Sequence, residues 1–161
     1  MEYRIEALDA FDVDGQTIVL TGSAKKNTAL AQAFWRTFNA ALKKAYRTQG
    51  GNWVKYAFMS RKDGVLYYTC AVPARAAVPE GFLRQRIPRH RCLVFEYRGR
   101  MEDIYGAYRE IYHTALPQSG FAPAAEDFLH FEKYTARFRW NAGGSVIEIW
   151  VPVREKSPED G

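Results

Sequence analysis

The sequence has few residues of the kinds that build metal sites or nucleophile sites. Its 161 residues include two cysteines, Cys70 and Cys92, and three histidines, His90, His113 and His130. Each cysteine lies inside an apolar run without CxxC spacing, which favours two buried, unreactive thiols over a disulfide. The histidines have neither HxxxH nor HExxH spacing, so we expect no metal site.

Long apolar runs and nucleotide-binding motifs are also lacking. No stretch approaches the roughly 18 apolar residues that a membrane-spanning helix needs, and no charged-then-apolar leader opens the chain. These absences predict a cytoplasmic protein without a membrane partner. The glycines show neither GxxxxGK[ST] nor GxGxxG spacing, and no GxSxG elbow occurs. We therefore expect no cofactor.

Aromatic residues, by contrast, are abundant. They make up 15% of the chain, with ten Tyr and four Trp. Because these side chains line wet pockets as well as cores, they favour a small-molecule site. The net charge of +5 invites a nucleic-acid partner. However, the densest basic stretch lies on expected strands, where it is more typical of a solvated face or a protected edge, so direct nucleic-acid binding is not expected. This stretch contains Arg84, Arg86, Arg89, Arg91, Arg98 and Arg100.

Hydrophobic periodicity divides the chain into short strands and two helices. Asn27 is the expected N-cap of a helix to about Tyr46, and a second helix is expected over 102–116. Asp14-Gly15 and Asp63-Gly64 are expected turns, the second of which joins a β-hairpin. The strands are expected at 3–8, 16–21, 56–61, 65–72, 82–87, 91–98, 128–138 and 146–153, with 82–87 and 91–98 paired around Pro88.

A strand, a helix and a hairpin occur twice in the same order. Ala41-Leu42 in the first helix matches Ala115-Leu116 in the second, and each hairpin ends in Val-Pro, at Val72-Pro73 and at Val151-Pro152. One β-α-β-β unit is too small to bury its sheet face alone. We therefore expect an α+β fold in which two such units pack as a pseudo-twofold pair around a central ligand cleft. The expected divisions are a single domain at 1–154, repeats at about 3–74 and 82–154, and a disordered tail at 155–161.

The final expected strand carries an unusual acid. One of its faces is wholly apolar and is expected in the core, whereas the other carries Glu148 beside Trp150. A carboxylate beside an indole suits an organic cation, although an exposed Glu on a half-solvated strand gives the same pattern. In the first repeat these positions are Thr69 and Ala71, so the duplicated scaffold does not require the acid. The core face comprises Ile147, Ile149, Val151 and Val153.

Further aromatic residues are candidates for the wall of the same pocket. Tyr67 shares a strand face with the repeat equivalents of Glu148 and Trp150. Tyr108 and Tyr112 lie on the apolar stripe of the second helix, where core packing is the plainer interpretation. Trp35 flanks the stripe of the first helix, and Trp53 lies in the loop that follows; both suit either a core or a pocket edge.

A series of short motifs covers nearly the whole chain. They are Phe34 to Phe38, Tyr56 to Pro73, Ile87-Pro88, Cys92 to Gly99, Ile111-Tyr112, Leu116 to Phe121, Phe131 to Tyr134 and Glu148 to Pro152. In their order and spacing these motifs resemble those of the GyrI-like, or AraC-type effector-binding, domains. The resemblance implies a duplicated fold with a ligand cleft in which a strand glutamate, matched here by Glu148, meets lipophilic or cationic molecules. Many relatives have an aromatic residue where this chain has Ala115.

Three functions follow as hypotheses. The first is binding of a lipophilic small molecule of cationic or electrophilic character in the cleft between the repeats, for effector sensing or for drug or toxin sequestration, with Glu148 as the charge partner. The second, implied by one branch of the family, is a hydrolase of strained electrophiles that uses Glu148 as general base. The third is an interaction protein that acts on a transcription regulator or on DNA gyrase through the Arg84–Arg100 face.

Overall fold

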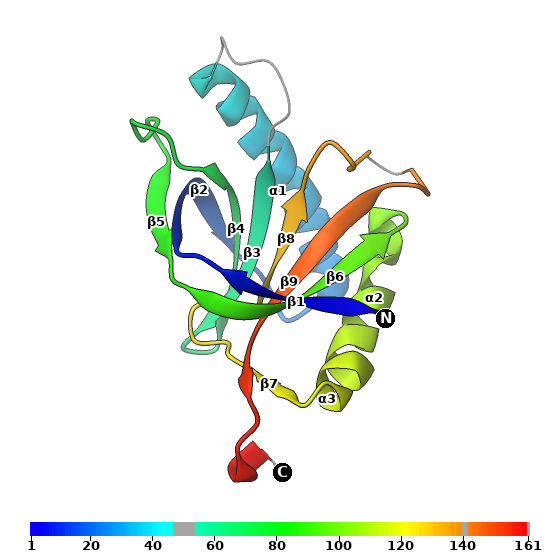
Figure 1. The fold of residues 1–161 in the computed structure, drawn as a ribbon. Coiled ribbons are helices and arrows are strands. Elements are labelled where there is room, and N and C mark those ends of the chain that lie inside the picture. Colours follow the sequence, from blue (N-terminus) through cyan, green and yellow to red (C-terminus); the bar gives the residue numbers. More distant parts are fainter. Residues whose placement is uncertain (47–53, 140–141, 161) are drawn as a thin grey trace.

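The computed structural model describes residues 1–46, 54–139 and 142–160. Nine strands in this part of the chain form one antiparallel sheet in the order β1-β6-β9-β8-β3-β4-β2-β5, and β7 adds to β9 (Figure 1). The predicted α+β class is confirmed. Trp53 lies outside the described residues. The strands are β1 (Tyr3–Leu8), β2 (Phe11–Val19), β3 (Lys55–Lys62), β4 (Val65–Pro73), β5 (Leu83–Ile87), β6 (His90–Arg98), β7 (Phe121–Pro123), β8 (His130–Tyr134) and β9 (Val146–Glu155).

Two helical segments pack against the same face of this sheet (Figure 1). The first, α1 (Ala24–Ala45), has Ser23 as its N-cap because the Ser23 hydroxyl accepts from Lys26 N–H at 3.3 Å. The predicted cap Asn27 is wrong, since its side chain bonds to Thr21 instead. In the described part of the chain, neither segment is long and apolar enough to cross a membrane.

The second helical segment changes its winding along its length. It runs from a 3-10 turn (Met101–Asp103) through α2 (Ile104–Glu110) and a π-helical turn (Ile111–Ala115) to α3 (Leu116–Gln118). In the π turn, the Leu116 N–H donates to the Ile111 carbonyl, five residues back. Pro117 follows at once and has no N–H to restore the α-helical bond. The predicted helix is therefore present, with an insertion of the kind that often marks a functional region.

The two β-α-β-β segments have the same strand order. The first contributes β2, β4 and β3 to the sheet, and the second contributes β6, β9 and β8. They meet where β3 pairs with β8, with Phe58 opposite Phe131. The centre of the sheet is thus the junction between the two halves of the chain.

The predicted pairing of 82–87 with 91–98 is wrong. Instead β6 pairs with β1, from Tyr3–Phe95 to Leu8–His90, and β5 pairs with β2, from Phe11–Ile87 to Gly15–Leu83. Both ladders share one register, so they form a single bent ribbon that is interrupted near Pro88, which cannot donate to a ladder. The first strand of each half therefore pairs with the other half.

Of the two Asp-Gly turns, one is confirmed and one is wrong. Asp63 and Gly64, with φ of 51° and 78°, close the β3–β4 hairpin. Asp14 and Gly15 instead continue β2, because Arg84 donates to both carboxylate oxygens of the buried Asp14, at 2.8 and 3.1 Å. A Cβ on Gly15 would lie 2.4 Å from the Cys70 carbonyl oxygen, so only glycine permits this close pairing.

Both faces of the sheet are buried. The larger core lies between the sheet and the helices and contains the predicted face of β9, which is confirmed. The smaller core lies on the opposite face, inside the bend of the sheet. Cys70 belongs to the first and Cys92 to the second, and both are buried free thiols, as predicted. Burial raises the pKa of Cys92 to about 12 and that of Cys70 further, so neither is a reactive thiolate.

Regular secondary structure continues past residue 154, where the sequence predicts that the domain ends. Strand β9 continues to Glu155, and Pro158–Asp160 form a 3-10 turn. Arg154 holds this turn by donating to both carboxylate oxygens of Asp160, at 2.7 and 2.8 Å. Lys156 also donates to the Pro117 carbonyl at 2.8 Å, which joins the tail to α3.

Candidate functional site

A buried carboxylate lies at the junction of the two halves. Glu132, on β8, is 8% exposed and points to the helix-covered face, because its neighbour Phe131 packs in the opposite core. Its ladder neighbours are Ala57 on β3 and Ile149 on β9, which offer no polar group from their side chains. An acid so placed is costly unless other groups solvate it.

Two tyrosine hydroxyls solvate this carboxylate. Tyr108 of α2 donates to Oε2, and Tyr134 at the end of β8 donates to Oε1, both through short hydrogen bonds. Burial raises the pKa of Glu132, and the two hydrogen bonds oppose this shift only in part. None of the ion pairs formed among the described residues involves Glu132. The carboxylate is thus hydrogen-bonded but has no countercharge.

Aromatic side chains surround Glu132 and complete what we call the Glu132 cage: Glu132, Tyr108, Tyr134, Tyr68 and Trp35. The Trp35 ring stands edge-on to Tyr134, with centroids 5.4 Å apart, and Trp35 Nε1 donates to the Tyr68 hydroxyl at 2.8 Å. Burial and the charge of Glu132 together raise the pKa of Tyr68 well above its usual value. The cage draws on α1, α2, β4 and β8, and therefore on both halves of the chain.

A buried histidine adjoins the cage. The ring of His130 lies 4.5 Å from that of Tyr108, and its Nδ1 is joined to the Tyr112 hydroxyl by a 2.7 Å hydrogen bond. Burial lowers the pKa of His130 to about 4, so the ring is neutral at physiological pH. His130 therefore adds no positive charge beside Glu132.

A surface hollow lies on the outer side of Tyr108 and Tyr112. Its volume is about 390 Å³, and it is lined by Ala24, Tyr105, Tyr108, Arg109, Tyr112 and His113. Because Tyr108 both lines this hollow and bonds Glu132, it forms the partition between the hollow and the buried carboxylate. Tyr112 lines the hollow beside it and bonds His130.

The predicted acid Glu148 lies on the opposite face of the sheet. Its Oε2 accepts from Arg4 at 2.7 Å, and its Oε1 accepts from Trp150 Nε1 at 3.0 Å. Partial burial acts to raise the pKa of Glu148, but the bonds from Arg4 and Trp150 outweigh it, so the pKa is lowered. Trp150 stacks on Phe131 at 5.5 Å and 11° within the smaller core.

The structure divides the predicted site residues into separate groups. Trp35, Tyr108 and Tyr112 all lie on the helix-covered face, whereas Glu148 and Trp150 lie together on the other. Tyr67 also faces away from the helices, but on β4, with β8 and β3 between it and β9. Glu132 is not among the predicted site residues. The signal was available, since Glu132 alternates with His130 and Tyr134 on one strand face.

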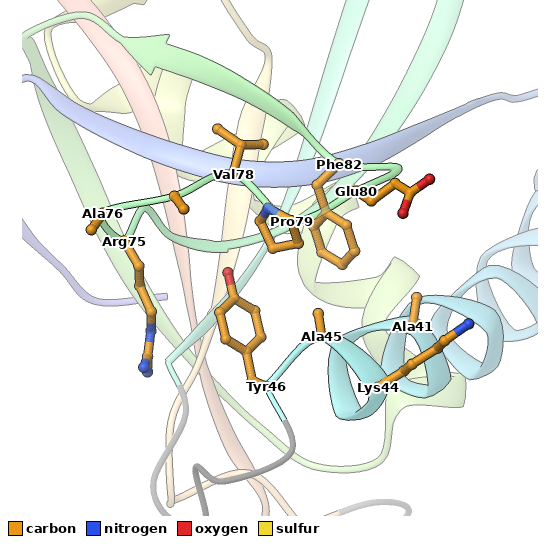
Figure 2. Close-up of a pocket in the computed structure, with 11 residues that line it drawn as sticks. Ala41, Lys44, Ala45, Tyr46, Arg75, Ala76, Val78, Pro79, Glu80 and Phe82 are labelled. Carbon is orange, nitrogen blue, oxygen red and sulfur yellow. The ribbon is translucent and has the colours of Figure 1, made fainter.

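A wider hollow, of about 740 Å³, lies between the end of α1 and the segment before β5 (Figure 2). Figure 2 shows the Tyr46 ring between these elements, with the side chain of Arg75 beside it. The Cζ atom of Arg75 lies 5.1 Å from the centroid of the Tyr46 ring. None of the predicted site residues lines it. Its basic residues, Lys44 and Arg75, do not suit an organic cation, although Glu80 lies at the rim.

Comparison with known proteins gives a consistent assignment. Residues 4–153 match the family described as Cass2, integron-associated effector binding protein. The transcriptional regulator BrlR of Pseudomonas aeruginosa is 31% identical over 104 residues, which are 62% of this chain and 38% of that protein. The chain thus spans well under half of that regulator.

Solved structures share the fold at low sequence identity. The protein SAV2435, solved bound to tetraphenylphosphonium, has a TM-score of 0.75 and 17% identity, covering 96% of this chain and 94% of that one. An integron cassette protein from the mobile metagenome of Vibrio cholerae has a TM-score of 0.66 and 18% identity, covering 94% and 95%. These likenesses establish a GyrI-like fold.

Proposed function

The chain belongs to the Cass2 family of integron-associated effector binding proteins, and on this premise we propose that it binds a lipophilic organic cation at the Glu132 cage. The observation that carries the proposal is a buried carboxylate with tyrosine donors and no countercharge among the described residues. A buried charge without an ion pair is costly, and natural chains keep such groups chiefly at functional sites.

The chemistry of the cage supports a cation without strong hydration. A bound cation would supply the missing countercharge, and the rings of Trp35, Tyr68 and Tyr134 would contribute their negative faces. A large apolar cation loses little hydration on entering such a site, unlike an ammonium ion. Tetraphenylphosphonium, the ligand of the similarly folded SAV2435, has these properties.

The outer hollow supports a route to the cage. A ligand entering there meets Tyr108 and Tyr112 first. Displacing the Tyr108 hydroxyl from Glu132 would open the partition and leave the carboxylate free to meet the cation. The π-helical turn directly after α2 gives this part of the helix an irregular hydrogen-bond pattern, which favours such an adjustment.

The test is calorimetric titration with tetraphenylphosphonium. We expect Glu132→Gln to weaken binding by about 30-fold or more, because truncating one partner of a desolvated charge pair costs about 2 kcal/mol at least. Glu148→Gln is the matched control, with an expected change of less than about twofold, since Arg4 and Trp150 already occupy that carboxylate.

The role of Glu148 as charge partner stays a prediction, and the same titration decides between the two acids. Loss of binding in Glu148→Gln with unchanged binding in Glu132→Gln would refute the proposed site. Equal affinity of both variants and the unsubstituted protein would refute an acidic site on either face.

The hydrolase hypothesis needs a carboxylate that takes a proton from water. Glu148 is a weak base for this, because Arg4 and Trp150 hold its pKa below the usual value. A panel of strained-ring electrophiles tests the hypothesis, and turnover that disappears in Glu148→Gln would support it.

The interaction with a transcription regulator or DNA gyrase is also a proposal. In the Arg84–Arg100 stretch, Arg86 pairs with Asp12 at 3.3 Å and Arg91 with Glu155 at 3.6 Å. Arg84 holds the buried Asp14, so its reversal would disturb the fold. Charge reversal at Arg86 and Arg91 followed by a pull-down is therefore the cleaner test of this face.

A further inference from the structure

Strand β1 has an edge that no described strand covers. Its ladder partner in the described chain is β6 alone. Its side chains are largely exposed, with Tyr3 at 37% and Ile5 at 53%. An uncovered edge presents unpaired N–H and C=O groups that another strand can bind.

The opposite end of the sheet has a second open edge, on β5, which has a different charge pattern. Consider two copies of one strand that pair antiparallel with their helices on the same side of the joined sheet. The residue numbers of any two side chains that face each other then differ by zero or by an even number. For β5, a register centred on Gln85 sets Arg84 against Arg86, and a register centred on either arginine sets it against itself. Like charges directly opposite destabilise a ladder, so β5 is protected from self-pairing.

On β1 the same operation brings unlike charges together. A register centred on Ile5 sets Arg4 of each copy against Glu6 of the other, on the face that also carries Glu148. On the helix side it sets Ile5 against Ile5 of the second copy and Tyr3 against Ala7. Registers centred on Arg4 or Glu6 set a charge against itself. A register centred on Ala7 pairs only the end of the strand and brings no unlike charges together, so the register centred on Ile5 is favoured.

We propose that this edge is an interaction surface and that its partner is a second copy of the chain, paired β1 to β1 with Ile5 at the twofold axis. The contact is isologous and closed, because each copy uses the same strand once. Two hydrogen bonds already hold the Arg4 guanidinium on this face of the strand. Its Nε donates to Glu6 of the same strand at 2.9 Å, and its Nη2 donates to Glu148 at 2.7 Å. The guanidinium has further N–H groups to donate to Glu6 of the second copy.

Sedimentation velocity over a range of protein concentrations tests the proposal. We expect a reversible dimer of the unsubstituted chain. Arg4→Glu sets two acids against each other at both positions, and Glu6→Arg sets two arginines against each other. Each variant alone should therefore associate at least about tenfold more weakly. An equimolar mixture of the two restores both opposite-charge pairs, so it should form a heterodimer as tight as the original dimer.

Two further variants complete the test. Ile5→Asp places two carboxylates at the twofold axis without disturbing a buried side chain, so it should also dissociate the dimer even if Arg4→Glu folds poorly. Arg86→Glu, on the other open edge, should leave the dimer intact. A monomer at every concentration, failure of the mixture to associate, or a dimer that survives Ile5→Asp would each overturn the proposal.

Discussion

Glu132 and Glu148 are one residue out of register on adjacent strands, yet they have opposite surroundings. Glu132 faces Ile149 across the β8–β9 ladder, and Glu148 faces Lys133. Glu132 points to the helices, where hydroxyl groups are its donors and burial raises its pKa. Glu148 points to the other face, where a guanidinium and an indole lower its pKa.

The difference teaches which acid is available to a ligand. Glu148 already has a cation at contact distance, so a second cation would have to displace Arg4. Glu132 has hydrogen bonds that solvate its charge and none that neutralise it. A buried acid without a countercharge is destabilising by itself, whereas an acid paired with Arg4 contributes to the fold. This difference supports the proposed binding at Glu132, and it indicates that Glu148 stabilises the fold.

The largest expected effect is the loss of stability when Trp150, on the Glu148 face, is replaced. We expect Trp150→Ala to lower the free energy of unfolding by about 3–5 kcal/mol, because it removes a buried ring stacked on Phe131. Urea denaturation measures this loss. The fraction that stays folded should bind tetraphenylphosphonium with unchanged affinity.

Trp35→Phe is the matched change on the helix-covered face. It keeps an aromatic ring but removes the 2.8 Å bond to the Tyr68 hydroxyl, so we expect about 1 kcal/mol of destabilisation. It should weaken cation binding, unlike Trp150→Ala. The reverse result, weaker binding only in Trp150→Ala, would place the ligand beside Glu148.

Much of the fold could be predicted because the residues that determine it act locally. Alternation on β9 and the Asp63-Gly64 turn are short-range signals, and the structure confirms both predictions. Asp14-Gly15 has the same turn chemistry, but Arg84, seventy residues away, holds that aspartate in a strand. A long-range ion pair of this kind leaves no local trace in the sequence.

The choice between the two acids likewise depends on tertiary structure. Strand alternation shows that Glu148 and the apolar residues of β9 lie on opposite faces, but here the sheet bends and buries both faces. Glu132 alternates with His130 and Tyr134, which is no less distinctive a pattern. Sequence periodicity indicates which side chains share a face, but not which face the helices cover.

The pH dependence of binding sharpens the comparison further. Only the ionised acid attracts a cation, and the pKa of Glu132 is raised above the ordinary 4.5. Binding should therefore weaken as the pH falls through that raised value, by about tenfold per unit below it. His130 stays neutral until about pH 4 and does not cause this loss.

Titrations with tetraphenylphosphonium at a series of pH values measure this profile. Glu148→Gln should retain it, whereas Glu132→Gln should give a weak, flat profile. If Glu148 were the charge partner, its lowered pKa would let binding persist below pH 4.5. If Glu132 is the charge partner, binding is lost at a pH above the ordinary glutamate pKa. If Glu148 is the charge partner, binding is lost below it.

The smallest expected effect is on thermal stability, and the two acids should give it opposite signs. Because the folded state raises the pKa of Glu132, ionising this group costs stability at every pH above that value. Glu132→Gln removes the cost, so its Tm should exceed that of the unsubstituted protein by a few degrees at pH 8, with the difference disappearing as the pH falls below the unfolded value.

Glu148 behaves in the opposite way, because its lowered pKa contributes stability above the unfolded pKa that is lost as the pH falls through the folded one. Glu148→Gln should therefore lower the Tm at pH 8. The loss should be at most about 1 kcal/mol, since the side chain of Arg4 is 43% exposed and solvent screens the pair. Calorimetry of both variants at pH 8 and at low pH measures the contrast. A Tm that falls in Glu132→Gln would mean that Tyr108 and Tyr134 hold this carboxylate for stability, and that the cage is part of the core.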